Sequence, residues 1–539
     1  MLKKLASTII ALCLVGLTAV GCGNSEGGAS EETTVQPTTE PKAIVTNLHK
    51  PDKANWRYNE DFGFYYQNGI AYCDNPVEES YERLDIFVPE EYMNATDNGD
   101  GTFTCEMNGD AKLNGYSALD APIIMPVLTT GFKEEKAWTD SVMEELYGMA
   151  MSMASEFTSQ GFVFIHPGCR GITEGVPTGV TDIKAAVRYV RYCDDTIAGD
   201  AESIFVFGMS GGGAQTAVLG ASGDSELYTP YLKAVGAVEG VSDSVKGAMC
   251  WCPVTDLGTA NAEYEWMMGC TRTGRSTEEQ ALSDSLAKAY ADYVNKAGFR
   301  DENGNVLTLT ESQEGIYQAG SYYDYIKGVI ENSLNNFLSD TDFGSGTAED
   351  YINSMNADRK WISYDKSTNT ATVTSVADFC KECKNASELI VAFDQPDSQN
   401  TLFGYGYRKP SHFDRMLADS LAEIGSEYAS DYADDLTKTD AFGNTVEQRV
   451  DMFSPLYYLM ESRGGYGKSN VAEYWRIRTG IKQTTNSLTC EVNLALALKH
   501  YDGVKSVDFE TVWDKDHTEA ERTGDRSVNF AEWVNSCMK

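Results

Sequence analysis

The glycines around Ser210 point to a serine that acts as a nucleophile. The G-x-S-x-G motif at 208–212 follows an apolar, strand-like run at 203–208 and opens a helical pattern at 211–220. Such a turn, a nucleophile elbow, holds the serine in strained backbone dihedrals, and only tiny neighbours let strand and helix approach across it. It would lift the hydroxyl clear of a sheet and aim the N–H of Gly211 at a developing oxyanion. The alternative is a glycine-rich turn at a helix start, which the flanking strand and helix disfavour.

A base for this serine is expected near the C-terminus, because the triad of an α/β-hydrolase runs in the order serine, acid, histidine. The strand-like run at 507–513 is followed by Asp-Lys-Asp-His, which ends at His517. His517 is therefore the predicted general base, taking the Ser210 proton and returning it to the leaving alcohol. The chain has five histidines, and the other four lack this position, so we expect them to have structural roles: His49, His166, His412 and His500.

A second oxyanion donor is expected in the loop after an early central strand. The run at 122–128 is followed by Thr-Thr-Gly-Phe, in which Gly131 permits close approach of the backbone. We expect Gly131 to act with Gly211, although Gly131 could equally be a turn glycine.

Short runs rich in β-branched and aromatic residues alternate with helical patterns along the chain. This alternation predicts an α/β protein with a mostly parallel, doubly wound sheet covered by helices on both faces. Apolar residues at helical spacing over 181–190 predict a crossover helix between two strands. The predicted strands span 82–88, 102–107, 122–128, 161–166, 203–208, 247–253, 388–393, 473–478 and 507–513.

The pattern changes between about 256 and 468, which we interpret as a lid insertion within one hydrolase domain at 46–539. A helix over 276–297 is opened by Ser276 and Glu279 at capping-box spacing. The turn at 97–101 lacks the residues that an EF-hand loop requires and predicts a hairpin instead.

Composition limits the classes of function. The 539 residues include 43 Lys and Arg against 81 Asp and Glu, a formal charge of −38. Such a field repels phosphate backbones and anionic headgroups, so we expect no nucleic-acid partner and no polybasic membrane patch. A hydrophobic content of 42% is enough for a large core.

The N-terminus predicts export. Lys3 and Lys4 precede an apolar run over 5–20, and Ala-Val-Gly-Cys ends at Cys22, similar to a bacterial lipobox. Residues 1–22 would be a lipoprotein signal peptide with lipidation at Cys22, and 23–45 a flexible acidic tether. The protein would then be extracytoplasmic, anchored to the membrane only through its lipid. The alternative is an ordinary secreted protein with an incidental cysteine.

The cysteines do not indicate a scaffold or a metal. Eleven remain after residue 22, too few for a disulfide framework in so long a chain. Cys380 and Cys383 form a lone CxxC, while Cys250 and Cys252 fall in a predicted strand, so we expect no zinc site. No metal or organic cofactor is expected.

Several segments resemble the bacterial tannase and feruloyl-esterase-like branch of the α/β-hydrolases, over nearly the whole chain after the tether. They are GFVFIHPGCRG from 161, the elbow with the stretch to 232, AEYEWMMG from 262, FDQPDSQNTLFG from 393, WRIRTG from 475 and VWDKDHT from 512. The resemblance implies a serine esterase acting on phenolic-acid esters, with a large lid that helps to bind the aromatic acyl group. Ser210 and His517 match its nucleophile and base.

The acid of the triad does not match. The resemblance implies an aspartate in a D-x-D-T-S-like context after the penultimate strand, whereas 479–488 has no carboxylate and Glu491 is the next. Gln483 and Asn486 each offer an amide oxygen to the imidazole without the charge. Replacing the triad acid costs about 10⁴ in turnover in a serine protease. A relocated acid is the other solution, from Asp394, Asp397, Asp514 or Asp516.

Acidic positions that the resemblance implies near the phenolic ring are also changed. Gln399 precedes Asn400 where the family carries a glutamate, and Thr485 lies in the second carboxylate position. The resemblance thus implies substrate contacts for these three residues, while a gallate-type preference is in doubt.

Two functions of different class follow. The first is an extracytoplasmic serine carboxylic-ester hydrolase, either with a relocated acid or as a slow enzyme that uses a Ser-His pair, acting on a small-molecule ester. The second is a lipoprotein that binds a ligand without turnover, which the missing acid favours and the intact elbow and histidine oppose. A peptidase is a weaker third hypothesis, since no propeller-like repeat precedes the catalytic domain.

Overall fold

The structure is a computed structural model, and it describes residues 43–138, 147–384, 398–405 and 409–539. Residues Ala43–Lys539 form one compact unit. The predicted signal peptide, Cys22 and the tether up to residue 42 lie outside the described residues, as do Asp394, Asp397 and the predicted strand at 388–393.

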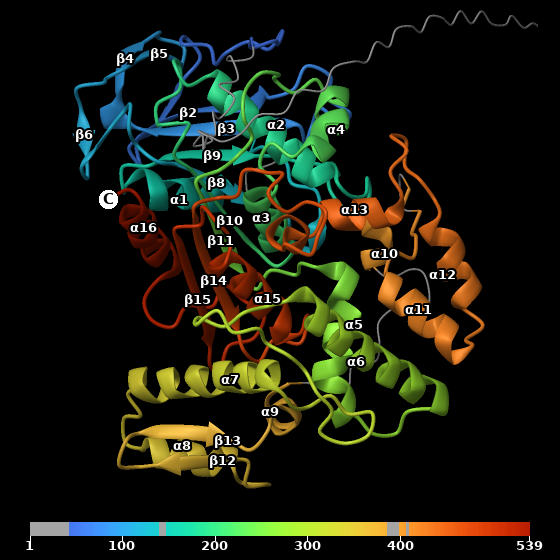
Figure 1. The fold of residues 1–539 in the computed structure, drawn as a ribbon. Helices are drawn as coiled ribbons and strands as arrows, with labels where there is room; N and C mark the ends of the chain where they lie inside the picture. Colours follow the sequence, from blue (N-terminus) through green and yellow to red (C-terminus); the bar gives the residue numbers. More distant parts are fainter. Residues whose placement is uncertain (1–42, 139–146, 385–397, 406–408) are drawn as a thin grey trace, which may run out of the picture. The chain divides into compact units, whose positions relative to one another are not determined.

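A nine-stranded sheet forms the centre of this unit, in the order β1-β2-β3-β9-β8-β10-β11-β14-β15 (Figure 1). The pairs from β9 to β15 are all parallel, and those from β1 to β9 are antiparallel. The predicted mostly parallel sheet is thus confirmed. Its strands are β1 (Arg57–Asn59), β2 (Phe64–Ala71), β3 (Arg83–Pro89), β8 (Ile123–Val127), β9 (Val163–Pro167), β10 (Ile204–Met209), β11 (Gly247–Trp251), β14 (Tyr474–Gly480) and β15 (Ser506–Val512).

Successive side chains of a strand point to opposite faces of the sheet, so the apolar strands make both faces apolar. Helices cover both of these faces. On one face Phe205 packs on Trp533 of α16 (Arg526–Cys537) and Phe207 on Phe157 of α1 (Tyr147–Thr158), with ring centroids 5.6 Å and 5.5 Å apart. The alternate residues of β10, Ile204 and Val206, belong to the core on the other face. That face is covered by α2 (Thr178–Tyr192), α3 (Gly211–Ala221) and α15 (Leu488–Lys499).

One predicted strand lies outside the central sheet, and one strand of that sheet was not predicted. The predicted strand at 102–107 is β5 (Phe103–Met107), which pairs with β4 (Met93–Asp97) in a separate hairpin around the predicted turn, outside the central sheet. The strand β2 was not predicted, because a register shift between Gln67 and Ile70 interrupts the period-two pattern.

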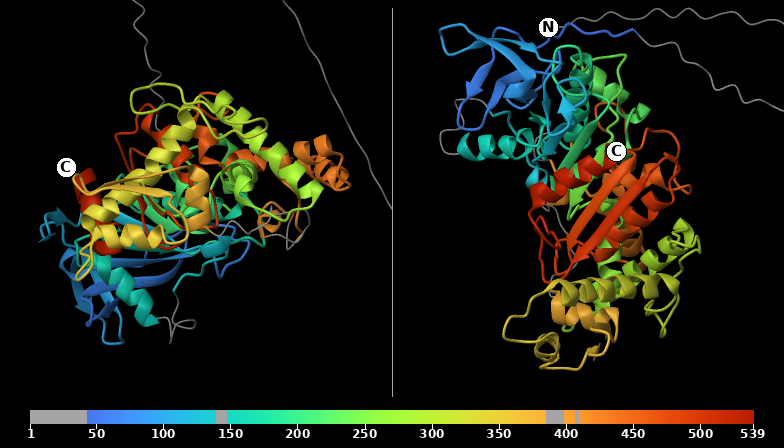
Figure 2. Two further views of the ribbon diagram at one scale, coloured as in Figure 1. Left: turned by 90° about the horizontal axis from the view of Figure 1, so that it is seen from below. Right: turned by 90° about the vertical axis from the view of Figure 1, so that its left-hand side faces the viewer.

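The predicted lid insertion corresponds to the chain between β11 and β14. Its α6 begins after Ser276, and both hydrogen bonds of the predicted capping box with Glu279 are present. In Figures 1 and 2, α7 lies next to the β15 edge of the sheet, with the β12–β13 hairpin on its far side, and α7 contacts both β15 and β13. The elements are α5 (Leu257–Met268), α6 (Thr277–Ala297), α7 (Ser321–Asp340), α8 (Ala348–Met355), β12 (Ile362–Asp365), β13 (Thr370–Val373), α9 (Val376–Cys383), α10 (Ser398–Leu402), α11 (Arg415–Ile424), α12 (Ala429–Leu436), α13 (Val446–Met452) and α14 (Pro455–Leu459).

The beginning of the described chain is already attached to the domain. Val45, the last residue of the predicted tether, exchanges two backbone hydrogen bonds of 3.1 Å with Glu239. Within the described ranges, no helix is long and apolar enough to cross a membrane.

Candidate active site

Ser210 stands in the sharp turn between β10 and α3, with φ 61° and ψ −122°. This is a strained conformation for a residue with a side chain, as a nucleophile elbow requires. The flanking glycines are needed for space: a Cβ on Gly208 would lie 2.4 Å from the oxygen of Gly212, and one on Gly212 would lie 2.1 Å from the oxygen of Val127. The sequence therefore dictates the turn that raises the Ser210 hydroxyl.

His517 lies between Ser210 and Gln483. Its Nε2 is 2.8 Å from Ser210 Oγ, and its Nδ1 is 2.6 Å from Gln483 Oε1. An amide oxygen only accepts, so Nδ1 carries the proton and Nε2 is free to accept the proton of the serine hydroxyl. Burial lowers the pKa of His517, which keeps the ring neutral and available as a base at neutral pH.

The loops after β14 and β15 bring His517 and Gln483 together. The N–H of Ile481 donates to Val512 O and that of Lys482 to Lys515 O, both at 3.0 Å. A Cβ on Gly480 would lie only 2.0 Å from Asp516 O, so the two backbones are in contact where the loops cross. Adjacent parallel strands end at the same edge of the sheet, and these bonds fix the loops to each other beyond it.

Of the candidates for the third member, Gln483 is the one that the structure places on the imidazole. Asp516 is exposed at the loop surface. Asp514 is also exposed and forms an ion pair with Lys482. Asp394 lies outside the described residues. The group that contacts His517 Nδ1 is therefore a neutral amide that is 2% exposed.

A buried carboxylate, Glu491 of α15, lies directly behind this amide. Its Oε1 accepts from Gln483 Nε2, from Thr479 Oγ1 at 3.1 Å and from Asn486 Nδ2 at 3.0 Å. Lys384, itself buried, donates to the backbone oxygen of Gln483 at 2.6 Å. Burial raises the pKa of Glu491 to about 7. The hydrogen-bond donors and the charge of Lys384 favour the ionised form and oppose this rise.

Glu491, Thr479 and Lys384 were not among the residues predicted to act in the site. A signal for Glu491 was present, because it is the one charged residue in the apolar run from Leu488 to Leu498. A carboxylate buried among apolar residues requires partners, which implies a polar site at that point of the fold.

The predicted oxyanion loop lies against the elbow. Gly131 has φ 64° within the turn Thr130–Phe132, and a Cβ on Gly211 would lie 2.5 Å from the nitrogen of Phe132. Thr129 at the start of this loop donates to Gln215 of α3 at 3.1 Å, which fixes the loop to the helix. The first N–H groups of α3 have no acceptor within the helix, so Gly211 can offer one to a substrate oxygen.

The residues predicted to touch substrate are spread over two elements. Asn400 of α10 is buried, and its Nδ2 has no hydrogen-bond partner among the residues that the structure describes, while Gln399 beside it is half-buried. Thr485 is exposed on the loop after β14, two residues beyond Gln483. The structure thus places Thr485 on the same loop as Gln483 and leaves Asn400 with a donor that no described residue accepts.

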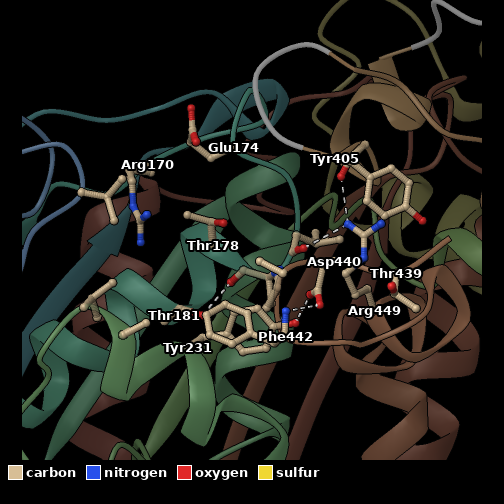
Figure 3. Close-up of a pocket in the computed structure, with 17 residues that line it drawn as sticks. Arg170, Glu174, Thr178, Thr181, Tyr231, Tyr405, Thr439, Asp440, Phe442 and Arg449 are labelled. Atoms are coloured by element: carbon tan, nitrogen blue, oxygen red, sulfur yellow. Dashed lines mark hydrogen bonds between the residues drawn. The ribbon is translucent and has the colours of Figure 1, made fainter. Parts of the chain in front are cut away.

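One cavity reaches His517 and another lies apart from it. The first, of about 310 Å³, has His517, Thr130 and Met209 among its lining residues, which do not include Ser210. A second, of about 380 Å³, is shown in Figure 3, and the residues that line it include neither Ser210 nor His517. There Arg449 donates to the carbonyl oxygens of Val176, Phe403 and Gly404, and so joins the segment between β11 and β14 to the loop after β9.

The other buried histidines occupy structural positions. His166 of β9 stacks on Trp138 with centroids 3.9 Å apart and lies 3.3 Å from Asp85. His412 stacks on Tyr432 and pairs with Asp435 at 2.8 Å. Both rings are anchored on two sides.

Comparisons with known proteins concern the fold and the family resemblance. A family model named BD-FAE matches residues 135–297. No curated protein matches the sequence. Among solved structures, the native tannin acyl hydrolase from Lactobacillus plantarum is 24% identical, with a TM-score of 0.70 over 91% of this chain and 99% of that one.

Two further structures are equally similar. The tannase from Fusobacterium nucleatum is 25% identical, with a TM-score of 0.69 over 91% of this chain and 99% of that one. A tannin acyl hydrolase in complex with ethyl gallate is 25% identical, with a TM-score of 0.68 over 88% and 94%. The predicted α/β-hydrolase fold and the resemblance to bacterial tannases are confirmed.

Proposed function

We propose that this chain is a serine carboxylic-ester hydrolase in which Ser210 is the nucleophile, His517 the base and Gln483 the third member. The observation that carries the proposal is the continuous hydrogen-bonded series from Ser210 Oγ to His517 to Gln483, beside a nucleophile elbow. The similar tannases hydrolyse esters, which supports the same class of reaction here.

In the first half-reaction Ser210 Oγ attacks the carbonyl carbon of the ester while its proton passes to His517 Nε2. The carbonyl oxygen becomes an oxyanion, for which Gly211 and the loop at Gly131 offer backbone N–H groups. The bond from carbon to the alcohol oxygen then breaks, and the alcohol leaves with the proton from His517. The acyl group remains on Ser210.

In the second half-reaction a water attacks the acyl carbon and gives its proton to His517. Collapse of this intermediate returns the proton to Ser210 Oγ and releases the carboxylic acid. No group beyond these side chains and the backbone donors is used.

Gln483 fulfils one of the two roles of the usual triad aspartate. Its oxygen accepts from Nδ1 and so fixes the ring and its tautomer. It carries no charge to stabilise the imidazolium, whereas a triad aspartate both holds the tautomer and supplies that charge, and its replacement by an amide costs about 10⁴ in turnover in a protease. We therefore expect an enzyme slower than one with a direct carboxylate.

The substrate class and location are further parts of the proposal. Similar tannin acyl hydrolases bind ethyl gallate and 3,4-dihydroxybenzoate, which supports small phenolic-acid esters as substrates. The absence of carboxylates at Gln399 and Thr485 favours a less hydroxylated ring than gallate. Lys3, Lys4 and the lipobox-like Cys22 support an extracytoplasmic, lipid-anchored protein.

The test is covalent labelling of the purified protein with a fluorophosphonate, followed by intact mass spectrometry. We expect one addition to the wild type, no addition to Ser210→Ala, and slow addition to His517→Ala. Hydrolysis of phenolic esters such as methyl ferulate should follow the same order.

The neutral Gln483 also favours a second function, a protein that binds such esters without turnover. A folded wild type that adds no fluorophosphonate but binds methyl ferulate would establish this second function and refute the first.

A further inference from the structure

The orientation of the Gln483 amide decides whether His517 can act as a base. With Oε1 toward the ring, Nδ1 must carry the proton and Nε2 accepts from Ser210. If the amide were reversed, its NH₂ would face Nδ1, the ring proton would move to Nε2, and Ser210 would face a donor. An amide alone does not select between these two orientations.

Glu491 makes the selection. Gln483 Nε2 donates to Glu491 Oε1 and lies 2.7 Å from Thr479 Oγ1. In the reversed orientation Oε1 would meet the Glu491 carboxylate, and two acceptors would face each other in a buried site. Three donors converge on this one oxygen of Glu491, an arrangement that suits an ionised carboxylate.

We propose that Glu491 is a positioning residue that acts on His517 through Gln483, fixing the reactive tautomer and placing a negative charge one amide away from the imidazolium. It takes over in part the function of the missing triad aspartate. This inference rests on the proposed esterase function, since it concerns the same Ser210.

The surroundings of Glu491 determine when the carboxylate is ionised. Lys384 faces it from the end of α9 and favours the charge, while Glu263 of α5 opposes it. The thiols of Cys252, after β11, and Cys490, on α15, also lie within its electrostatic range and are held neutral by burial. Since burial raises the pKa of Glu491 to about 7, its ionisation falls within the working range of an esterase.

The experiment measures the second-order rate constant of fluorophosphonate labelling from about pH 5.5 to 9, which spans the ionisation of His517 and Glu491. Glu491→Gln keeps the shape and removes the charge. We expect it to label about 10- to 100-fold more slowly at pH 8, the usual size of an effect through an intermediate group, and to lose the inflection near pH 7.

The double variant Gln483→Glu with Glu491→Gln moves the carboxylate one group closer to His517. We expect it to regain the wild-type rate or exceed it, which a merely structural role for Glu491 does not predict. Glu263→Gln is the matched control: it removes a neighbouring buried glutamate that binds Thr259 and Thr489 and does not contact Gln483. At pH 8, where Glu491 is mostly ionised with or without Glu263, we expect it to label within about threefold of the wild type.

Several outcomes would overturn the inference. The first is that Glu491→Gln labels at the wild-type rate with an unchanged pH profile. The second is that Glu491→Gln labels slowly and the double variant does not restore the rate. If Glu491→Gln does not fold, the double variant decides alone: a folded double variant that labels more than about 10-fold below the wild type has the same meaning. Failure of the wild type itself to label would refute the esterase function, which is a separate result.

Discussion

At the scale of single residues, the site depends on a glutamine where the mechanism ordinarily uses an acid. Gln483→Ala leaves Nδ1 of His517 without its acceptor at 2.6 Å, so the reactive tautomer is no longer selected. We expect labelling of Ser210 to slow by about 100-fold or more, part of the loss of about 10⁴ known for the loss of a triad acid. The measurement is the labelling rate at pH 8.

The control for this variant is Asp516→Ala. Asp516 is exposed and adjacent to His517 in the chain. We expect its rate to stay within about twofold of the wild type, since an exposed carboxylate contributes little. A larger loss in Asp516→Ala than in Gln483→Ala would move the role of third member to the aspartate.

Glu263 allows a second prediction at this scale, on stability. Burial raises its pKa from 4.5 to about 7 in the folded protein. Below about pH 4.5 the neutral side chain contributes fully to the stability of the folded state, and this contribution is lost as the pH rises through 7. At pH 8 the buried charge costs about 3 kcal/mol, so Glu263→Gln should raise the free energy of unfolding there and change it little at pH 5.

Denaturant unfolding at both pH values measures this difference. Glu314→Gln is the comparison, because Glu314 is exposed, and its effect should stay below about 0.5 kcal/mol at either pH. An equal gain for Glu263→Gln at pH 5 and pH 8 would mean that ionisation is not its cause.

At the scale of elements, the contact between the loops after β14 and β15 positions His517. A Cβ on Gly480 would lie 2.0 Å from Asp516 O and 2.6 Å from Lys515 O, and backbone atoms cannot yield as a flexible side chain does. Gly480→Ala should therefore displace His517, lower the free energy of unfolding by about 1–3 kcal/mol and slow labelling by more than about 10-fold.

Gly328 of α7 provides the matched substitution. A Cβ there meets no atom within 4 Å, so Gly328→Ala should leave labelling unchanged and stabilise the helix by up to about 1 kcal/mol. Thermal unfolding and labelling of both variants test the pair. Normal labelling by Gly480→Ala would show that the loop tolerates the shift.

The parts of the site that depend on residues close together in the sequence could be predicted from it. The glycines around Ser210 dictate the elbow, and the order of strands places His517 beyond β15. The partner of His517 was left open between Gln483 and several aspartates, since only packing of two loops distant in sequence decides it. Likewise β2 was missed because a bulge breaks its alternation.

At the scale of the whole molecule, the formal charge of −38 acts on the folded state through self-repulsion. Most of the 81 carboxylates are on the surface, where salt screens them over about 10 Å at 0.1 M, whereas buried pairs such as Lys184 with Asp243 at 2.7 Å are screened much less. Added NaCl should therefore weaken repulsion more than attraction. We expect the melting temperature at pH 8 to rise by about 2–4 °C between about 0.02 M and 0.3 M NaCl.

The same titration at lower pH separates this cause from others. As the pH falls towards the isoelectric value of about 4.4, the net charge approaches zero and the effect of salt should vanish. A salt effect that persists there would come from exclusion of salt from apolar surface. A melting temperature that falls with salt at pH 8 would instead mean that surface ion pairs such as Arg522 with Asp340 outweigh the net repulsion.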